Sequence, residues 1–236
     1  LAAWAFIMHR YCRQERLAIA VISNGRTVRG AEDAIGLFIE TLPVLCAMDD
    51  TQSVTSNIAA LRQSLLDALD HEHLSLDEIL AVLPKLRRDD IGDTPLLRVS
   101  FVLEHASWFP ATFNGAKVVQ VGEAVSGDVE GTHKFDLGLA MVRDEAGYRA
   151  SIEYAADLFE SDTIDRLAGH LRQALTAMVA SPENRLSELD MLTAVERRQM
   201  LVERNDTATN YPAHKSIHEL FEEQVRRAPN TVAVIF

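Results

Sequence analysis

The eight histidines of the chain are the side chains best suited to acid–base or metal chemistry near neutral pH. Only two of them lie close together in sequence, in the tripeptide His71-Glu72-His73. Ligands spaced i, i+2 suit a strand, but this pair falls between two predicted helices, and no cysteine or third histidine follows at ligand spacing. We therefore predict no metal site. His170 lies between two leucines of a predicted helix, and we interpret it as a structural histidine that is either hydrogen-bonded or exposed.

The other polar candidates do not form a catalytic set. The sequence contains no HExxH, GxSxG, P-loop or GxGxxG motif. His133 precedes a predicted strand and is a candidate to reach a cleft, whereas Asp136 and Glu153 fit the solvated faces of two predicted strands. The charged run 87–90 fits an exposed loop with local ion pairs. Because no nucleophile, base and orienting group come together, we predict no catalytic residue here and no self-sufficient enzyme.

The composition is that of a folded globular protein, since 47% of the 236 residues are hydrophobic and 25% are charged. This length allows one large domain, or one domain plus part of a second. A net charge of −12 argues against general nucleic-acid binding, which needs a basic face. No apolar run is long enough to span a membrane, and the N-terminal stretch does not resemble a signal peptide. Cys12 and Cys46 form no CxxC pair, so we expect two ordinary buried or half-buried thiols in a reduced, cytoplasmic protein.

Hydrophobic periodicity predicts the elements that must position these side chains. The N-terminal stretch places Leu1, Trp4, Met8 and Tyr11 on one helical face. Segment 17–23 is apolar on both faces and rich in β-branched residues, as in a central strand covered on both sides. The elements predicted up to residue 104 are a helix over 1–14, strand 17–23, a loop over 23–30, a strand within 35–44, helix 53–70, a helix near 75–83 and strand 97–104.

The two longest predicted helices each present one apolar face. In the helix over 53–70 the spaced residues are Val54, Ile58, Leu61, Leu65 and Leu69. The helix over 162–180 begins at Ser161, and its predicted buried residues are Ile164, Leu167, Leu171, Leu175 and Met178.

Further strands complete the pattern. Segments 135–142 and 148–154 both alternate and are joined by RDEAG, which predicts a β-hairpin. Residues 105–131 are rich in glycine and irregular, with a short strand near 117–121. The predicted fold class is therefore mixed α/β, with a mixed sheet covered by helices.

The composition changes after Ser181. SPENRLSELDMLT is polar with sparse apolar anchors, which suits a linker docked on a surface. Thr193 with Glu196, and Ser216 with Glu219, have the spacing of capping boxes for two short helices. TVAVIF then has the pattern of the first strand of a second domain. Because the chain begins without methionine and ends on an apolar strand, we expect a piece of a longer protein, cut at both ends.

IGLFIETLPV, residues 35–44, is apolar except at Glu40 and Thr41, and a buried strand does not accept an unpartnered carboxylate. This stretch resembles the IGxFVNTLPL motif of condensation domains in nonribosomal peptide synthetases. Four further segments resemble motifs of that family in the same order: RYCRQERLAIAVISNGR with RYxGQxDxxVGxPVxGR, DHEHLSLDEIL with HQDxPFExL, RRDDIGDTPLLRVSFVLE with RDxSRxPLFQVxFxxQ, and KFDLGLAM with KFDLxLxx. The tail, above all NDTATNYP and IHELFEEQ, is similar to the linker and opening of an adenylation domain. The resemblance spans essentially the whole chain.

The resemblance implies that residues 1–181 are the C-terminal lobe of a condensation domain, 182–215 a linker with short helices, and 216–236 the start of an adenylation domain. The family fold is a V of two lobes, each similar to chloramphenicol acetyltransferase. Its reaction transfers a carrier-bound acyl or peptidyl group onto the amine of the next carrier-bound amino acid, in antibiotic and other secondary-metabolite biosynthesis. The family's catalytic histidine lies in an HHxxxDG motif of the other lobe. No two histidines are adjacent here, so we expect this chain alone to be inactive.

The implied partners are peptidyl carrier domains bearing phosphopantetheine, the N-terminal lobe, and the remainder of the adenylation domain, which alone uses ATP and Mg²⁺. Neither nucleic acid nor membrane is implied. The resemblance makes Arg26 a candidate either to anchor its loop, by pairing with the aspartate of the absent motif, or to be an exposed loop arginine. Glu40 stands where the family has Asn, which adds charge and removes a donor at a position that bears on substrate selection. The tunnel or cleft candidates are Arg26, Glu40, Thr41, His133 and Asp136.

Other functions remain open at this point. The rivals are a starter, dual-function, cyclisation or epimerisation domain, and a non-catalytic platform that binds carriers; the adenylation-like tail disfavours epimerisation. Three departures from the family motifs, at 71–73, 75–77 and 91–94, leave the subtype open, although we expect the fold to hold. Residues 105–131 match the element that reaches across to the other lobe in the family.

Overall fold

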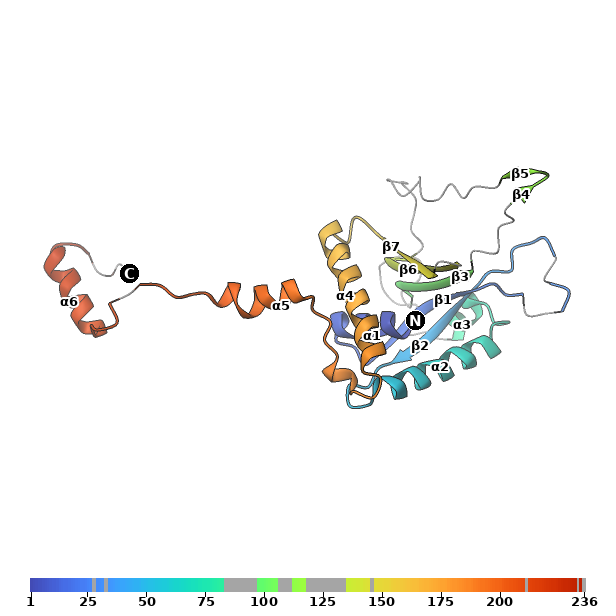
Figure 1. Cartoon of the computed structure of the whole chain (residues 1–236), viewed down its shortest axis with the longest axis horizontal. Helices are drawn as coiled ribbons and strands as arrows, with labels where there is room; N and C mark the ends of the chain where they lie inside the picture. The colour runs from blue at the N-terminus through green and yellow to red at the C-terminus, as the bar shows by residue number, and fades with distance from the viewer. Residues whose placement is uncertain are drawn as a thin grey trace. The chain divides into compact units, whose positions relative to one another are not determined.

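The computed structural model describes residues 1–26, 29–31, 34–82, 97–105, 112–117, 135–144, 147–210, 212–232 and 234 (Figure 1). They form two compact units, Leu1–Thr193 and Ala194–Phe236. The first unit contains α1 (Ala2–Cys12), β1 (Arg16–Ser23), β2 (Glu40–Ala47), α2 (Val54–Asp70), α3 (Leu76–Val82), β3 (Val99–His105), β4 (Thr112–Phe113), β5 (Ala116–Lys117), β6 (Leu137–Asp144), β7 (Gly147–Tyr154), α4 (Ser161–Ala180) and η4 (Leu186–Glu188). The second contains α5 (Ala194–Leu201), η5 (Glu203–Asn205) and α6 (Ile217–Arg227).

Within the described residues, a mixed sheet of five strands forms the centre of the first unit, in the order β2-β1-β3-β6-β7. β1 and β2 are antiparallel, and β6 and β7 form the hairpin predicted from their alternation. Between these pairs, β1 runs parallel to β3, and β3 runs parallel to β6. The last residues of β1 and β3 therefore lie at one end of the sheet, and the first residues of β3 and β6 lie at the other. This confirms the predicted fold class.

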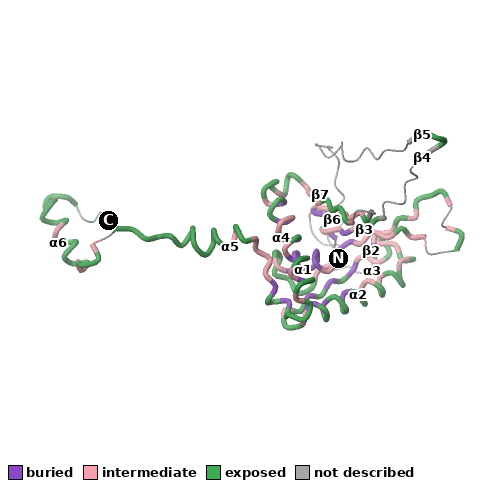
Figure 2. Tube along the Cα trace, viewed as in Figure 1, coloured by how far each residue is buried: buried purple, intermediate pink, exposed green. Residues whose placement is uncertain are grey.

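Three helices, α2, α1 and α4, cover one face of this sheet, and α1 contacts both of the others (Figure 1). The predicted N-terminal helix is confirmed, but its burial is not confined to one face, because every residue from Ala3 to His9 is buried and Tyr11 is exposed (Figure 2). A helix enclosed by two neighbours and a sheet must be apolar all round. The Tyr11 hydroxyl lies 2.7 Å from Nδ1 of His170, which confirms the structural role predicted for that buried histidine.

The opposite face of the sheet carries smaller side chains, among them Ala20, Ser100 and Gly138. A Cβ on Gly138 would lie 2.7 Å from Oγ of Ser100, so a larger residue there would require the Ser100 side chain to move. The long helices described here all cover the other face. Ala20 lies on that opposite face and is 0% exposed, and every other residue of segment 17–23 is buried or half-buried, which agrees with the expected cover on both sides.

The predicted helix faces are correct in outline and wrong in detail. In α2, Ile58 was predicted on the apolar face but is 44% exposed, whereas Asn57, which is not among the predicted residues, is 5% exposed. The Asn57 amide explains this, because it donates to the carbonyls of Asp49 and Ser53 and accepts from the Asp49 amide, so the loop before α2 needs it inside. In α4, Leu175 is exposed although it was predicted to be buried.

The segment after α4, residues 182–193 (called the strap here), belongs to the first unit. Its Leu186 and Leu189 are buried in the same core as the sheet. Backbone hydrogen bonds fasten it to the loop before α2, from the amide of Leu186 to the carbonyl of Gln52 and from that of Ser187 to the carbonyl of Asp50. The polar stretch predicted to dock on a surface does so, and the compact unit ends at Thr193.

The second unit, taken by itself, is short helices and extended chain. The capping box predicted for Ser216 and Glu219 is present at the start of α6. The strand predicted from TVAVIF is not formed at Thr231, Val232 or Val234, which are its described residues, because an isolated strand has no partner for its backbone groups. None of the helices described is long and apolar enough to cross a membrane.

Candidate functional site

The candidate site is an apolar groove at the end of the sheet where β1 and β3 finish. Its volume is about 350 Å³. Besides the last residues of both strands, its lining includes Leu65 and Leu69 of α2 and Ile39 just before β2. The polar lining residues are Ser23, Asn24 and Glu104. Apolar walls with a few polar groups suit a slender organic ligand.

The loop from β1 to β2 borders this groove and depends on a close backbone approach. Gly25 has a φ of +61°, in the left-handed region, and a Cβ there would lie 1.8 Å from the carbonyl oxygen of Phe38. Only glycine combines that conformation with that contact. The outgoing and returning parts of the loop therefore meet at this residue.

Arg26 holds the same loop together. Its Nη1 donates to the carbonyls of Ala31 and Ala34, the second at 2.8 Å. The guanidinium carbon also lies 4.4 Å from the centre of the Phe38 ring, within the range of a cation–π contact. The side chain is half-buried, and its described contacts are all within its own loop.

Glu40 and Thr41 begin β2, next to the groove. Glu40 pairs with Ser23 across the β1–β2 ladder, and alternation places it on the helix-covered face, while Thr41 lies on the opposite face. The residues before them do not form a buried strand, since Ile35 and Leu37 are almost fully exposed. Both polar residues are half-buried at the rim of the sheet, so the carboxylate does not enter a dry core.

The remaining candidates lie elsewhere. Asp136 precedes β6, at the opposite end of the sheet, where its Oδ2 accepts a hydrogen bond from Nη1 of Arg98 at 2.8 Å. His133, the run 87–90 and most of 105–131 lie outside the described residues. The structure therefore brings Arg26, Glu40 and Thr41 to one end of the sheet and separates Asp136 from them.

Ser23, which lines the groove, and Glu72, which contacts Ser23, were not singled out from the sequence as site residues. Ser23 Oγ donates to a carboxylate oxygen of Glu72 at 3.1 Å, and it accepts from the backbone amide of Gly25 at 3.3 Å. Glu72 belongs to the HEH tripeptide, which was considered for metal binding and as part of a family motif, but not as a partner of this loop. No three histidine, cysteine or acidic side chains gather into a metal-binding group among the described residues. A serine ending a strand beside a glycine is too common a pattern to have revealed this contact.

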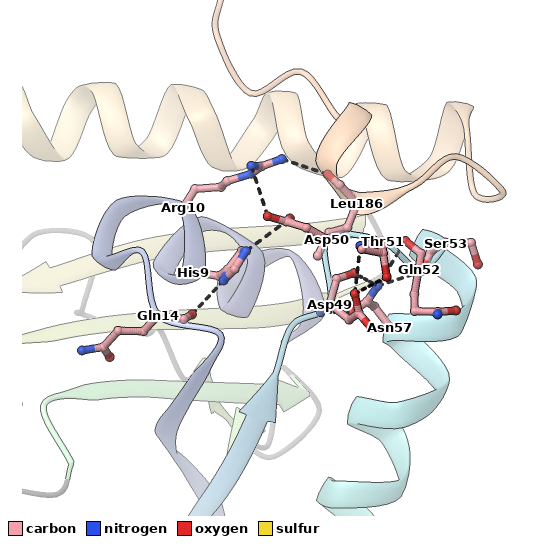
Figure 3. Close-up of polar contacts among 10 residues, drawn as sticks. All are labelled: His9, Arg10, Gln14, Asp49, Asp50, Thr51, Gln52, Ser53, Asn57 and Leu186. Atoms are coloured by element: carbon pink, nitrogen blue, oxygen red, sulfur yellow. Dashed lines mark hydrogen bonds and ion pairs between the residues drawn. The ribbon is translucent and has the colours of Figure 1, made fainter.

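A second polar cluster, at the other end of the first unit, holds the strap (Figure 3). Nδ1 of buried His9 lies 2.7 Å from the carbonyl of Gln14, and because a carbonyl can only accept, that nitrogen carries the proton. Its Nε2 faces Oδ1 of Asp50 at 3.3 Å. Arg10 lies beside the same carboxylate and donates from Nη2 to the carbonyl of Leu186 at 3.0 Å. The cluster joins α1, the loop before α2 and the strap, which is a structural role.

Two pKa shifts accompany this framework. Hydrogen bonds from the hydroxyl and then the amide of Thr51 lower the pKa of Asp49, which stabilises the turn before α2. Burial raises the pKa of the Cys46 thiol to about 12, so this cysteine is inert. Cys12 is exposed, not buried or half-buried as expected, because it ends α1 where the helix leaves the core.

Comparison with known proteins agrees with the resemblance that the sequence motifs carry. The condensation-domain family matches residues 1–201. Tyrocidine synthase 3 of Brevibacillus parabrevis is 30% identical over 234 residues, which are 99% of this chain and 4% of that protein. Gramicidin S synthase 2 of Brevibacillus brevis is 28% identical over 236 residues, 100% of this chain and 5% of that protein. The chain thus spans only a small part of these relatives.

Solved structures share the fold. A four-domain nonribosomal peptide synthetase, holo-AB3403 bound to AMP and glycine, superposes with a TM-score of 0.75 at 20% identity, over 97% of this chain and 18% of that one. The X-domain in complex with OxyB from teicoplanin biosynthesis gives a TM-score of 0.67 at 22% identity, over 81% and 41% of the two chains. With a family match over most of its length, this chain belongs to the condensation-domain family of nonribosomal peptide synthetases.

Proposed function

We propose that residues 1–181 form the C-terminal lobe of an amide-forming condensation domain, followed by a linker over 182–215, whose first part is the strap packed on that lobe, and by the start of an adenylation domain over 216–236. The observation that carries this proposal is the apolar groove of about 350 Å³ beside Glu40, in the stretch that resembles IGxFVNTLPL. The groove opens where the resemblance expects the cleft between two lobes.

In the proposed reaction, the amine nitrogen of the acceptor amino acid attacks the thioester carbonyl of the donor. A C–N bond forms, the C–S bond breaks, and the proton lost by the nitrogen ends on the released carrier thiol. The catalytic histidine is supplied by the HHxxxDG lobe. The residues of this chain shape the passage: Arg26 holds the loop at its rim, and Glu40 and Thr41 set the polarity there.

The donor and acceptor are attached through phosphopantetheine to peptidyl carrier domains in the cytoplasm. That arm is a slender chain with amide groups, and the groove offers apolar walls with Ser23 and Asn24 as polar groups at the rim. ATP and Mg²⁺ serve only the adenylation domain that this chain begins. The N-terminal lobe and the rest of that adenylation domain are the remaining partners.

The test uses the natural synthetase that contains this chain, with donor and acceptor carriers loaded, and detects the amide product by mass spectrometry. We expect product from the intact protein and none from residues 1–236 alone above a no-protein control. Product from 1–236 alone would show that the catalytic group lies in this chain. Carrier binding without any product from the intact protein would favour a non-catalytic platform; the X-domain complexed with OxyB is a protein of this fold that assembles with another protein.

A further inference from the structure

We propose that Glu72, in the turn between α2 and α3, is a positioning residue that sets the loop from β1 to β2 and with it the mouth of the groove. Its carboxylate holds Ser23 Oγ at 3.1 Å, and that hydroxyl in turn accepts from the Gly25 amide at 3.3 Å. A turn that is distant in sequence is thereby joined through one serine to the base of the loop.

The first step of the argument is the direction of the hydrogen bonds. A carboxylate only accepts, so Ser23 must donate its single proton to Glu72, and its lone pairs are then directed to other donors. The Gly25 amide is the donor they receive. Because a hydroxyl that donates to a charged group becomes a better acceptor, the two hydrogen bonds strengthen each other.

The second step concerns Gly25, where this relay of two hydrogen bonds, from Gly25 to Ser23 and from Ser23 to Glu72, begins at the loop. Gly25 is the residue that meets the carbonyl of Phe38 on the returning part of the loop, and the next residue, Arg26, stacks on the Phe38 ring. A shift of the Gly25 amide therefore moves both halves of the loop together. Ser23, Gly25, Arg26 and Glu72 are all at least partly sheltered from solvent.

The third step connects the relay to the groove. Leu65 and Leu69, which line the groove, lie on the last turns of α2, and Glu72 follows directly after that helix. Ser23 and Ile39 line the groove from the loop side. The contact between Glu72 and Ser23 thus ties one wall to the other, which makes it a determinant of the width of the mouth.

Three variants of the natural synthetase test this inference by amide hydrogen exchange over 24–26 and 34–39. Glu72→Ala removes the acceptor and should speed exchange by roughly 3- to 10-fold, the equivalent of one net hydrogen bond. Glu72→Gln keeps an oxygen acceptor and should stay within about twofold of the wild type. Asp70→Ala removes the same charge from the exposed end of α2 and should leave the exchange rates of these amides unchanged. In the β6–β7 hairpin, none of the three variants should change the exchange rates.

The activity readout rests on the proposed function. Glu72→Ala should raise KM for a loaded carrier several-fold with kcat nearly unchanged, and Glu72→Gln should keep KM near the wild-type value. The inference is overturned if Glu72→Ala leaves the exchange of the loop unchanged, or if Glu72→Gln or Asp70→Ala speeds it equally. If the wild-type synthetase forms no amide, the proposed function fails, while the exchange data still decide the role of Glu72.

Discussion

Replacing Leu186 with alanine asks whether the strap is part of the core of the first unit. The Leu186 side chain is 1% exposed and belongs to the same buried cluster as Trp4. Its backbone contacts, to the carbonyl of Gln52 and from the guanidinium of Arg10, do not depend on the side chain. The substitution therefore isolates the loss of apolar packing.

Leucine-to-alanine changes in cores cost about 2–5 kcal/mol, and the lower half of that range applies here because a segment at the edge of a core can partly collapse into the cavity. A loss of about 2–3 kcal/mol lowers Tm by roughly 4–12 °C for a unit of this size. Urea and thermal unfolding of the 236-residue chain, followed by tryptophan fluorescence, measure both quantities.

Leu201→Ala is the matched control, because that leucine lies in α5 and is 62% exposed. We expect it to change the free energy of unfolding by less than about 0.5 kcal/mol. Equal, small effects of Leu186→Ala and Leu201→Ala would refute the reasoning, since the strap would then be a loosely attached linker.

Three further predictions concern the loop, the thiols and the last helix. Gly25→Ala places a methyl group 1.8 Å from the Phe38 carbonyl, so we expect proteases to cleave the loop faster. At about pH 8 only Cys12 should react with a thiol reagent in the folded chain, because burial raises the pKa of Cys46 to about 12. Hydrogen bonds from the amide and the hydroxyl of Ser216 lower the pKa of Glu219. The stabilisation that this capping box gives α6 is therefore complete above the ordinary carboxyl pKa of 4.5 and is lost as the pH falls through the lowered value. Amide exchange in α6 should accordingly speed up in acid.

Each of these three predictions has an outcome that would contradict it. Gly30 also has a positive φ but no atom near its missing Cβ, so a Gly30→Ala variant cleaved as fast as Gly25→Ala would show that the clash is irrelevant. Two fast-reacting thiols in the folded chain would contradict the burial of Cys46. Glu219→Gln removes the titrating carboxylate and should flatten the pH response of α6, and an undiminished response would assign it to another group.

Much of the fold follows from periodicity, because a core face repeats in sequence. The β6–β7 hairpin and the long helices α2 and α4 were predicted within a few residues of their ends. The errors have a common cause. Asn57 is buried by hydrogen bonds to a neighbouring loop, and Tyr11 is 43% exposed although its hydroxyl reaches His170 of α4; both outcomes depend on tertiary contacts that no single-helix pattern records.

The site was less predictable, for the same reason. Arg26 and Glu40 were singled out by resemblance, but the partners of Arg26 are backbone carbonyls, which every residue possesses. Ser23 and Glu72 are 49 positions apart in the sequence, and serine and glutamate are too common for their presence to predict a contact. Only the folded chain brings the HEH turn against the end of β1.

The strand order also governs how the first unit is assembled. Its outer pairs are local: β1 with β2, and β6 with β7. Its centre is not, because residue 20 pairs with residue 100, and residue 99 with residue 137. Such non-local parallel pairing is slow, since a long chain segment must be ordered before the contact forms. During synthesis β1 and β2 can pair as soon as they emerge, and β3 follows. The sheet is complete only when the β6–β7 hairpin adds to β3, and Leu186 and Leu189 are the last core residues to emerge.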